Sequence, residues 1–328
     1  MKTIEELTQY YEINIKPELI LLDEKRLQIK KKLTPLIVID AIVLIISFGL
    51  IVYFSISIAW MLFPLSFCFI LIGGWYFTFY RDFLGQFKEK IIKKIVEFID
   101  PGLTYDESKY VPKDYFIESL IFPDRADRYE GDDFVSGRID KTDIQFSEIN
   151  VKHVEKTRQH VKPGEQKRTD TRTYPIFKGL FFVADFNKNF NKKTIVLPDK
   201  AEKLLGRLGQ KLQSMNISRG ELIKLEDPEF EKLFVVYGDD QIESRYVLST
   251  SLMRRISDFR KKANKEISLS FVASKLFVAI PYQKSLFEPS IFRTLVDFSK
   301  IQEYFEDLQI AINIVEDLNL NTRIWKKA

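Results

Sequence analysis

The sequence predicts an α+β protein with a two-helix transmembrane hairpin near the N-terminus, followed by a cytoplasmic domain of antiparallel sheet and packed helices. The first observation is an apolar stretch that runs almost without interruption from Leu33 to Phe79. The second is that strand-like and helix-like patterns follow it without strict βαβ alternation. The 328 residues have a mean hydropathy of −0.13, so the apolar excess is concentrated in one block. The composition therefore fits a membrane anchor on a larger soluble body.

Residues 1–32 are expected to form an amphipathic helical segment in two pieces. Thr3 and Glu6 have the spacing of a capping box, in which each side chain satisfies a free amide of the first turn. Pro17 is expected to interrupt the segment. Because acidic side chains near the start disfavour an anionic lipid surface, we expect packing against the cytoplasmic domain or a partner helix rather than against the membrane.

Residues 33–80 are expected to cross the membrane twice, with spans at about 36–54 and 60–79. Each span has about 20 residues, the length that a helix needs to cross the hydrocarbon core. A cleaved signal peptide is the competing interpretation, but a long polar segment precedes the apolar run and no small-residue cleavage site follows it. Asp40 lies inside the first span, where a carboxylate is a functional suspect. We expect it near the cytoplasmic headgroups, about one helical turn beyond Pro35.

Basic residues on both sides of the apolar run predict its orientation. They are Lys25, Arg26, Lys30, Lys31 and Lys32 before the run, and Arg81, Lys88, Lys90, Lys93 and Lys94 after it. The connecting turn, residues 55–59, carries no charge, so both termini are expected on the cytoplasmic side. The single cysteine, Cys68, lies in the second span, which leaves no disulfide framework and no thiolate zinc site in the soluble part.

Residues 81–100 are expected to continue the second span as an amphipathic stalk helix. Apolar side chains recur there every three or four residues: Phe83, Phe87, Ile91, Ile95 and Phe98. Such spacing places them on one helical face. Pro101 and Gly102 predict the end of the helix, and residues 101–328 are expected to form the cytoplasmic α+β domain.

The first part of this domain, from Phe134 to Leu197, is predicted to be antiparallel sheet. Residues 143–156 alternate between apolar and polar, and the alternation resets at Ile149, which predicts a bulge. Residues 157–173 are polar and predict a long flexible hairpin loop. The apolar run 175–186 predicts a central buried strand, and 194–198 a further short strand. Asp199 is expected to cap a helix with one apolar stripe, made of Leu204, Leu205, Leu208, Leu212 and Met215.

The last third mixes strands and helices. Strands are predicted at 233–237, 267–271 and 275–280, the last two as a hairpin. An amphipathic helix is expected over 251–262, and a final one over 299–318. The first has an apolar face of Leu252, Met253, Ile256 and Phe259 and an expected wet face of Arg254, Arg255, Arg260, Lys261 and Lys262.

Several blocks carry a resemblance to a known family. They are FKGLFFVADFNKNF (177–190), the long run 225–256, LFEPS with VEDLNLNTRIW near the end, and YEGDDFVSGRIDKTDIQFSE (129–148). Together they resemble the bacterial membrane proteins catalogued as domain of unknown function 3137. The resemblance implies one architecture and a bacterial inner-membrane location. It implies no catalytic residue, and it hints at a complex with membrane proteins of the LemA type.

The acidic region 226–243 is the candidate site for a metal or small molecule. Its carboxylates are Glu226, Asp227, Glu229, Glu231, Asp239, Asp240 and Glu243. Oxygen ligands suit Mg²⁺ or Ca²⁺, but the spacing matches no EF-hand loop. Asp239 and Asp240 follow a glycine, as ordinary turn residues do. Asp239, Asp240 and Glu243 therefore remain weak metal candidates, and no metal or cofactor is predicted.

Catalysis has little support in the sequence. The two histidines, His153 and His160, lie in or beside the polar loop, and no nucleophile elbow, P-loop or dinucleotide motif occurs. The basic side chains of that loop are Lys156, Arg158, Lys162, Lys167, Arg168 and Arg172. Without interleaved aromatics they do not predict nucleic-acid binding; a phosphorylated partner and lipid headgroups stay open.

The leading hypothesis is a membrane-anchored protein-binding or scaffold domain with no enzymatic activity. The alternative is a membrane-tethered enzyme or sensor that binds a lipid, metal or small molecule through residues 226–243.

Overall fold

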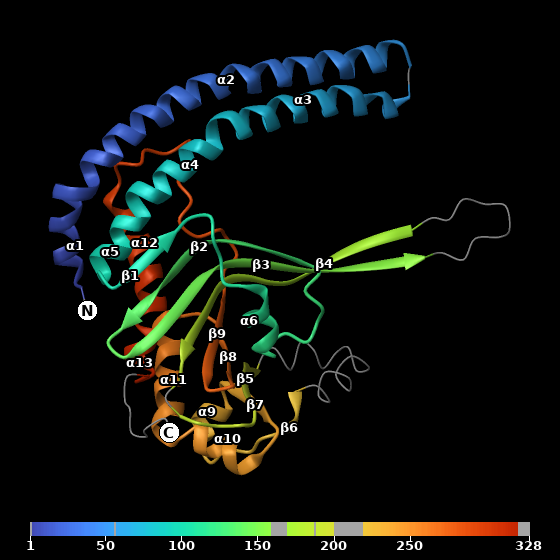
Figure 1. Ribbon diagram of the computed structural model, residues 1–328. Coiled ribbons are helices and arrows are strands. Elements are labelled where there is room, and N and C mark those ends of the chain that lie inside the picture. Colours follow the sequence, from blue (N-terminus) through green and yellow to red (C-terminus); the bar gives the residue numbers. More distant parts are fainter. Residues whose placement is uncertain (1, 56, 159–168, 187, 200–218, 321–328) are drawn as a thin grey trace. The chain divides into compact units, whose positions relative to one another are not determined.

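The computed structural model describes residues 2–55, 57–158, 169–186, 188–199 and 219–320 (Figure 1). The chain divides into two compact units, which are described separately below. Unit 1 comprises Met1–Ile95 and Phe287–Phe305, and unit 2 comprises Val96–Leu286 and Glu306–Ala328. A short segment of the expected 101–328 domain thus groups with the N-terminal helices.

Unit 1 consists largely of two long helical runs. The first contains α1 (Ile4–Tyr10), the π-helical turn η1 (Tyr11–Ile15) and α2 (Lys16–Tyr53). The second contains η2 (Ile58–Met61), α3 (Leu62–Trp75), η3 (Tyr76–Tyr80), α4 (Arg81–Phe87), η4 (Lys88–Ile92) and α5 (Lys93–Ile99), whose last residues belong to unit 2. The predicted capping box is present, since Thr3 Oγ1 accepts from the Glu6 amide at 3.2 Å and Glu6 Oε2 accepts from the Thr3 amide at 2.8 Å.

Pro17 does not interrupt the first run, contrary to the expectation. It lies at the junction where the π-helical turn η1 passes into α2, so its missing N–H falls where the regular helical hydrogen-bond ladder is already interrupted. Pro35 lies inside α2, and the helix continues through it to Tyr53. The N-terminal segment and the first apolar span are therefore one continuous helix.

Both helical runs have the length and composition of membrane spans, and the first lies near the N-terminus of the chain. Only 6% of the most apolar window in the first run, and 11% of that in the second, is buried inside the structure. A core helix of a soluble protein would bury most of that surface. Unit 1 therefore contains two candidate membrane-spanning helices.

The polar halves of the two runs pack against each other and against residues 287–305. Leu7, Leu19, Phe83 and Phe87 are all fully or almost fully buried there. The ring of Tyr11 meets that of Phe298 edge-on, with centroids 5.1 Å apart, and Phe87 meets Tyr304 in the same way at 6.0 Å. Apolar and aromatic contacts thus bring a segment from late in the sequence onto the N-terminal helices.

Unit 2 is built on a nine-stranded antiparallel sheet in the order β1-β2-β3-β4-β9-β8-β5-β7-β6. Its strands are β1 (Leu103–Asp106), β2 (Arg128–Ile139), β3 (Thr142–Arg158), β4 (Thr169–Asp185), β5 (Thr194–Pro198), β6 (Glu221–Leu222), β7 (Phe234–Gly238), β8 (Ser268–Val272) and β9 (Lys275–Pro281). The helices are α6 (Lys113–Glu118), α9 (Pro228–Glu231), α10 (Gln241–Val247), α11 (Thr250–Ala263), α12 (Phe298–Ile312), which starts in unit 1, and α13 (Ile314–Asp317). The predicted α+β class is confirmed, and β4 is a central strand as expected.

Both faces of the sheet are covered. On one face Phe116 of α6 belongs to a core cluster with Ile149 of β3 and Phe181 of β4. On the other, the Arg260 guanidinium of α11 lies over the Phe234 ring of β7, 5.0 Å from its centroid. Tyr237, in the same strand, belongs to the first cluster. Phe234 is three residues before it, and side chains an odd number of residues apart in a strand point to opposite faces of the sheet.

Because both faces of the sheet are covered, the reset in the apolar pattern at Ile149 has another explanation than a bulge within β3. β3 pairs with β4 without a shift from Ile144 to Val151. Ile144 and Ile149 face opposite layers, and both are buried, so the reset in the alternation marks a change of buried face. The extra residues lie in the two strands that flank this part of β3: β2 has one between Asp132 and Val135, and β4 has one between Pro175 and Phe177, opposite the step from Val151 to Lys152.

The strands on either side extend further into the predicted loop 157–173 than expected, since β3 reaches Arg158 and β4 begins at Thr169 (Figure 1). Basic residues Lys162, Lys167 and Arg168, with His160, lie outside the described residues, as does the predicted helix with Leu204, Leu205, Leu208, Leu212 and Met215. The predicted apolar face of α11 is confirmed, since Leu252, Met253, Ile256 and Phe259 are buried.

Candidate functional site

An irregularity in β2 brings three carboxylates together in the sheet. The pairing of β2 with β3 shifts between Asp132 and Val135, and Asp133 there adopts a left-handed backbone with φ of 59°. The neighbouring position 131 requires glycine, because other parts of the chain approach its Cα too closely for a side chain. A Cβ at that position would clash with the Glu148 carbonyl oxygen and would lie 2.8 Å from the Tyr110 Cβ.

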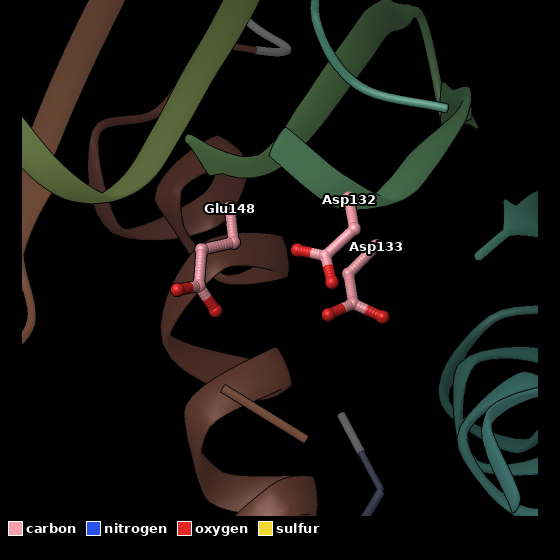
Figure 2. A group of neighbouring side chains, drawn as sticks. All are labelled: Asp132, Asp133 and Glu148. Atoms are coloured by element: carbon pink, nitrogen blue, oxygen red, sulfur yellow. The ribbon is translucent and has the colours of Figure 1, made fainter. Parts of the chain in front are cut away.

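The resulting acidic cluster consists of Asp132, Asp133 and Glu148, which Figure 2 shows pointing into one region. One ligand oxygen from each lies within 4.8 Å of the others. Asp133 is only 1% exposed and Glu148 only 6%. Buried carboxylates require hydrogen bonds or positive charge to offset the loss of water.

Hydrogen bonds from the protein itself reach this cluster. The Tyr105 hydroxyl of β1 donates to Asp133 Oδ1, and the Leu286 amide donates to Glu148 Oε2 at 2.5 Å. Burial and the adjacent Asp133 carboxylate raise the pKa of Tyr105, so the phenol stays protonated and remains a donor. The cluster therefore links β1, β2 and β3 to the segment that follows β9, through the Leu286 amide.

Sequence reasoning did not find this cluster. Asp132 and Glu148 become neighbours only through the β2–β3 register. The one local signal is a Gly-Asp-Asp run inside a strand-like segment, where glycine and aspartate are both unfavourable.

Asp239, Asp240 and Glu243, the weak metal candidates of the acidic region, make local hydrogen bonds and an ion pair. Asp240 caps α10 by accepting from the Glu243 amide at 2.7 Å. Asp239 pairs with Lys193 at 3.2 Å, and Glu243 accepts from the Asn191 amide. Within the described parts of the chain, none of these three belongs to a group whose ligand atoms converge within 4.8 Å.

Other carboxylates of the region act in the same way. Asp227 caps α9 by accepting from the amides of Glu229 and Phe230, both at 3.0 Å. Glu231 accepts from the Leu225 amide at 2.9 Å. Helix capping and loop closure thus account for much of the acidic composition.

Part of the region nevertheless lines a hollow between α9 and α11. It has a volume of about 610 Å³, and charges of both signs face it. Its lining residues are Glu226, Asp227, Pro228, Glu229, Thr250, Met253, Arg254, Ser257, Asp258 and Lys261. A second hollow of about 400 Å³ lies on the other side of α11, beside the ion pair of Lys262 with Asp317 at 2.9 Å.

The expected wet face of α11 needs one correction. Arg254, Arg255, Lys261 and Lys262 line the two hollows, but the side chain of Arg260 is only 14% exposed. It donates to the Leu233 carbonyl oxygen at 2.6 Å and pairs with Glu266 at 2.5 Å. Arg260 is therefore a packing residue of the sheet.

His153 lies beside Asp127, with Nδ1 2.7 Å from Oδ2, in a half-exposed position near the base of the β3–β4 hairpin. Asp127 also accepts from the Val154 amide at 2.8 Å. This second bond, with the smaller effects of His153 and Arg125, lowers the pKa of Asp127 below its ordinary value. The pair ties the segment before β2 to β3.

These features define an α+β protein with two candidate membrane-spanning helices and an acidic cluster in its sheet. Residues 175–320 match the sequence model of a family described as "Protein of unknown function (DUF3137)". The family inferred from the sequence is thus confirmed over these residues, which begin within β4 and include α11 and the segment 287–305. The block 129–148 lies outside the match. No curated protein and no solved structure matches the chain.

Proposed function

We propose that the chain is a membrane-anchored scaffold of the bacterial inner membrane whose sheet domain binds another protein. The exposed apolar windows of the two long helices support an anchor, because that surface is costly in water. Lys31, Lys32 and Arg81 are exposed at the start of the apolar region and just after it. The uncharged turn between the spans supports a multi-pass topology with both termini in the cytoplasm.

The proposal of protein binding rests on the far end of the β3–β4 hairpin. We call this part, residues 155–158 and 169–172, the ribbon. β2 pairs with β3 only as far as Lys152, and β9 pairs with β4 only from Gly179 onward. Among the described strands, the ribbon therefore has no third neighbour (Figure 1). Two-stranded ribbons are marginally stable alone.

The surface of the ribbon suits a polar protein partner. Glu155, Lys156 and Arg172 are exposed and carry both signs of charge. The outer edges of a two-stranded ribbon present backbone N–H and C=O groups to which an added strand can pair. A membrane protein of the LemA type is the first partner to test, because the family resemblance hints at a shared complex.

Photo-crosslinking in native membranes tests this proposal. A photoreactive phenylalanine replaces Tyr174, which is 43% exposed beside the ribbon. Capture of one membrane protein is expected at this position. The same group at Ile242, which is 80% exposed on α10, serves as the control and should not capture that protein.

A shortened chain makes the test specific. Val154 pairs with Thr173, so residues 155–172 can be replaced by Asn-Gly, a sequence that favours a tight hairpin turn. Position 174 keeps its photoreactive group, and capture should be lost. Equal capture by the shortened chain, or no capture above background by the full one, contradicts the scaffold proposal.

The hollow between α9 and α11 favours a second function, a membrane-tethered sensor or enzyme for a small charged ligand. Glu226 and Glu229 line it beside α9, and α11 contributes Arg254, Asp258 and Lys261, so a ligand that carries both signs of charge finds partners among them. Thermal shift of the full chain with divalent cations and nucleotides tests this, since binding to the folded state raises its stability. A shift that Arg254→Ala abolishes supports the sensor, and no shift with any probe contradicts it.

A further inference from the structure

The loop between β9 and α12 lies against the helices at the boundary of the expected spans. Ile291 is 9% exposed and forms a cluster with Leu33 and Trp75. Leu36 and Phe79 pack against the same cluster. Since Leu36 begins the first expected span and Phe79 ends the second, Ile291 sits at the depth where the helices enter the membrane.

Three hydrogen bonds hold the loop at this depth. The Tyr80 hydroxyl donates to the Pro289 carbonyl oxygen at 3.3 Å. Arg26 Nη1 donates to the Ile291 carbonyl oxygen at 2.8 Å. Further along, the Leu295 amide donates to Asp23 Oδ1 at 2.7 Å.

Arg26 and Asp23 are fixed in turn by each other. Their side chains form a two-pronged ion pair on one helical face, with Nε to Oδ1 at 2.7 Å and Nη2 to Oδ2 at 3.1 Å. Arg26 is only 5% exposed, and such paired geometry is among the stronger polar contacts in proteins. The loop is therefore anchored to α2.

Phe292, in the same anchored loop, has an exposed side chain. It follows the buried Ile291 directly and is itself 63% exposed. Arg293 beside it is exposed, and Lys32 lies at the same boundary with its ammonium over the Phe79 ring, 4.3 Å from the centroid. An exposed aromatic ring next to cations matches the chemistry of the bilayer interface, where rings sit at headgroup level and cations meet anionic headgroups.

We propose that the loop Pro289–Arg293 is a third membrane contact, with Phe292 in the lipid interface and Arg293 and Lys32 on anionic headgroups. This inference rests on the membrane anchor of the proposed function. It places part of the family-matched region 175–320 directly on lipid. Three points of attachment, the two spans and this loop, then orient unit 1 on the bilayer.

Spin-label accessibility in nanodiscs of anionic lipid tests the contact in the full chain. Nitroxides are placed by Phe292→Cys, Ile45→Cys or Ile242→Cys in a Cys68→Ser background. Ile45 is 71% exposed in the first span and reports lipid, whereas Ile242, 80% exposed on α10, reports water. At each position the ratio of collisions with oxygen to collisions with a water-soluble nickel complex is measured.

The ratio of oxygen to nickel collisions is expected to be high at position 45, low at position 242, and between the two at position 292, because an interfacial site is shallower than mid-span. If position 45 itself reports water, the membrane anchor is wrong. If position 45 reports lipid while position 292 behaves like position 242, the anchor stands and the loop contact is overturned.

Discussion

Replacement of Arg26 by methionine should release the loop 287–297 from α2. Methionine keeps much of the apolar stem but removes the guanidinium, and with it the bond to the Ile291 carbonyl oxygen and both bonds to Asp23. The side chains of Arg26 and Asp23 are only 6% and 17% exposed. Removing one partner of a buried ion pair costs about 3–5 kcal/mol.

The lower end of that range applies here. Asp23 keeps its bond from the Leu295 amide and some contact with solvent, which limits the penalty for its lost partner. A loss of about 3 kcal/mol corresponds to a factor of roughly 100 in the equilibrium for local opening, at 1.4 kcal/mol for each factor of ten.

Hydrogen exchange followed by mass spectrometry, on the full chain in nanodiscs, measures this opening directly. Peptides from 287–297 should exchange roughly 100-fold faster in Arg26→Met, again by the 1.4 kcal/mol rule, while peptides from the central strand β4 stay unchanged. Lys25→Met removes the exposed neighbouring cation and serves as the matched control. Exchange of 287–297 within about twofold of the native chain, less than 0.5 kcal/mol, would refute the role assigned to Arg26.

Three further predictions follow from buried groups. Asp40→Leu should raise the thermal midpoint in detergent, because both carboxylate oxygens of Asp40 are buried without a hydrogen-bond partner and an unpaired buried carboxylate is destabilising even close to the headgroups. Gly131→Ala should lower the free energy of unfolding in denaturant by about 1–3 kcal/mol, since the new methyl group meets the Glu148 carbonyl oxygen. Burial raises the pKa of Asp23, but Arg26 and the Leu295 amide outweigh it and hold the pKa below its ordinary value. The stabilisation from Asp23 is therefore complete above about pH 5 and is lost as pH falls below about 4, so the difference in thermal midpoint between the native chain and Asp23→Asn should shrink over that interval.

Each of these has its own counter-result. A lower midpoint for Asp40→Leu would reveal an unseen partner for the carboxylate. The neighbouring exposed change Glu130→Ala should leave the free energy of unfolding within about 0.5 kcal/mol, and an equal loss there would remove the steric explanation for Gly131→Ala. A midpoint difference for Asp23→Asn that persists unchanged to pH 3 would show that Asp23 does not stabilise the fold through its charge.

Periodicity predicted those elements whose burial is decided by local pattern. The apolar face of α11 and the strand β4 were predicted because each has a long, regular run of apolar side chains. The two candidate spans were predicted for the same reason. In α11 the buried side chains are the ones that the helical period selects, whereas β4 and the two spans follow from continuous apolar runs.

The features that the sequence did not predict depend on contacts between residues far apart in the chain. Arg26 was taken as a flanking membrane charge, yet its partner Ile291 lies 265 residues away in the chain. The acidic cluster depends on the β2–β3 register, and the coverage of both sheet faces depends on helices distant in sequence. None of these pairings leaves a periodic signal, because a single contact between two distant segments has no repeat.

The unbroken helix α2, Lys16–Tyr53, has a mechanical consequence. Its 38 residues span about 57 Å, nearly twice the hydrocarbon thickness of about 30 Å. The part before Leu33 then extends about 25 Å from the apolar region as a lever. A change of about 10° in helix tilt, such as a thicker or thinner bilayer induces, moves the free end by about 4 Å. Under the proposed membrane anchor, a change in bilayer thickness would therefore displace the N-terminal helices.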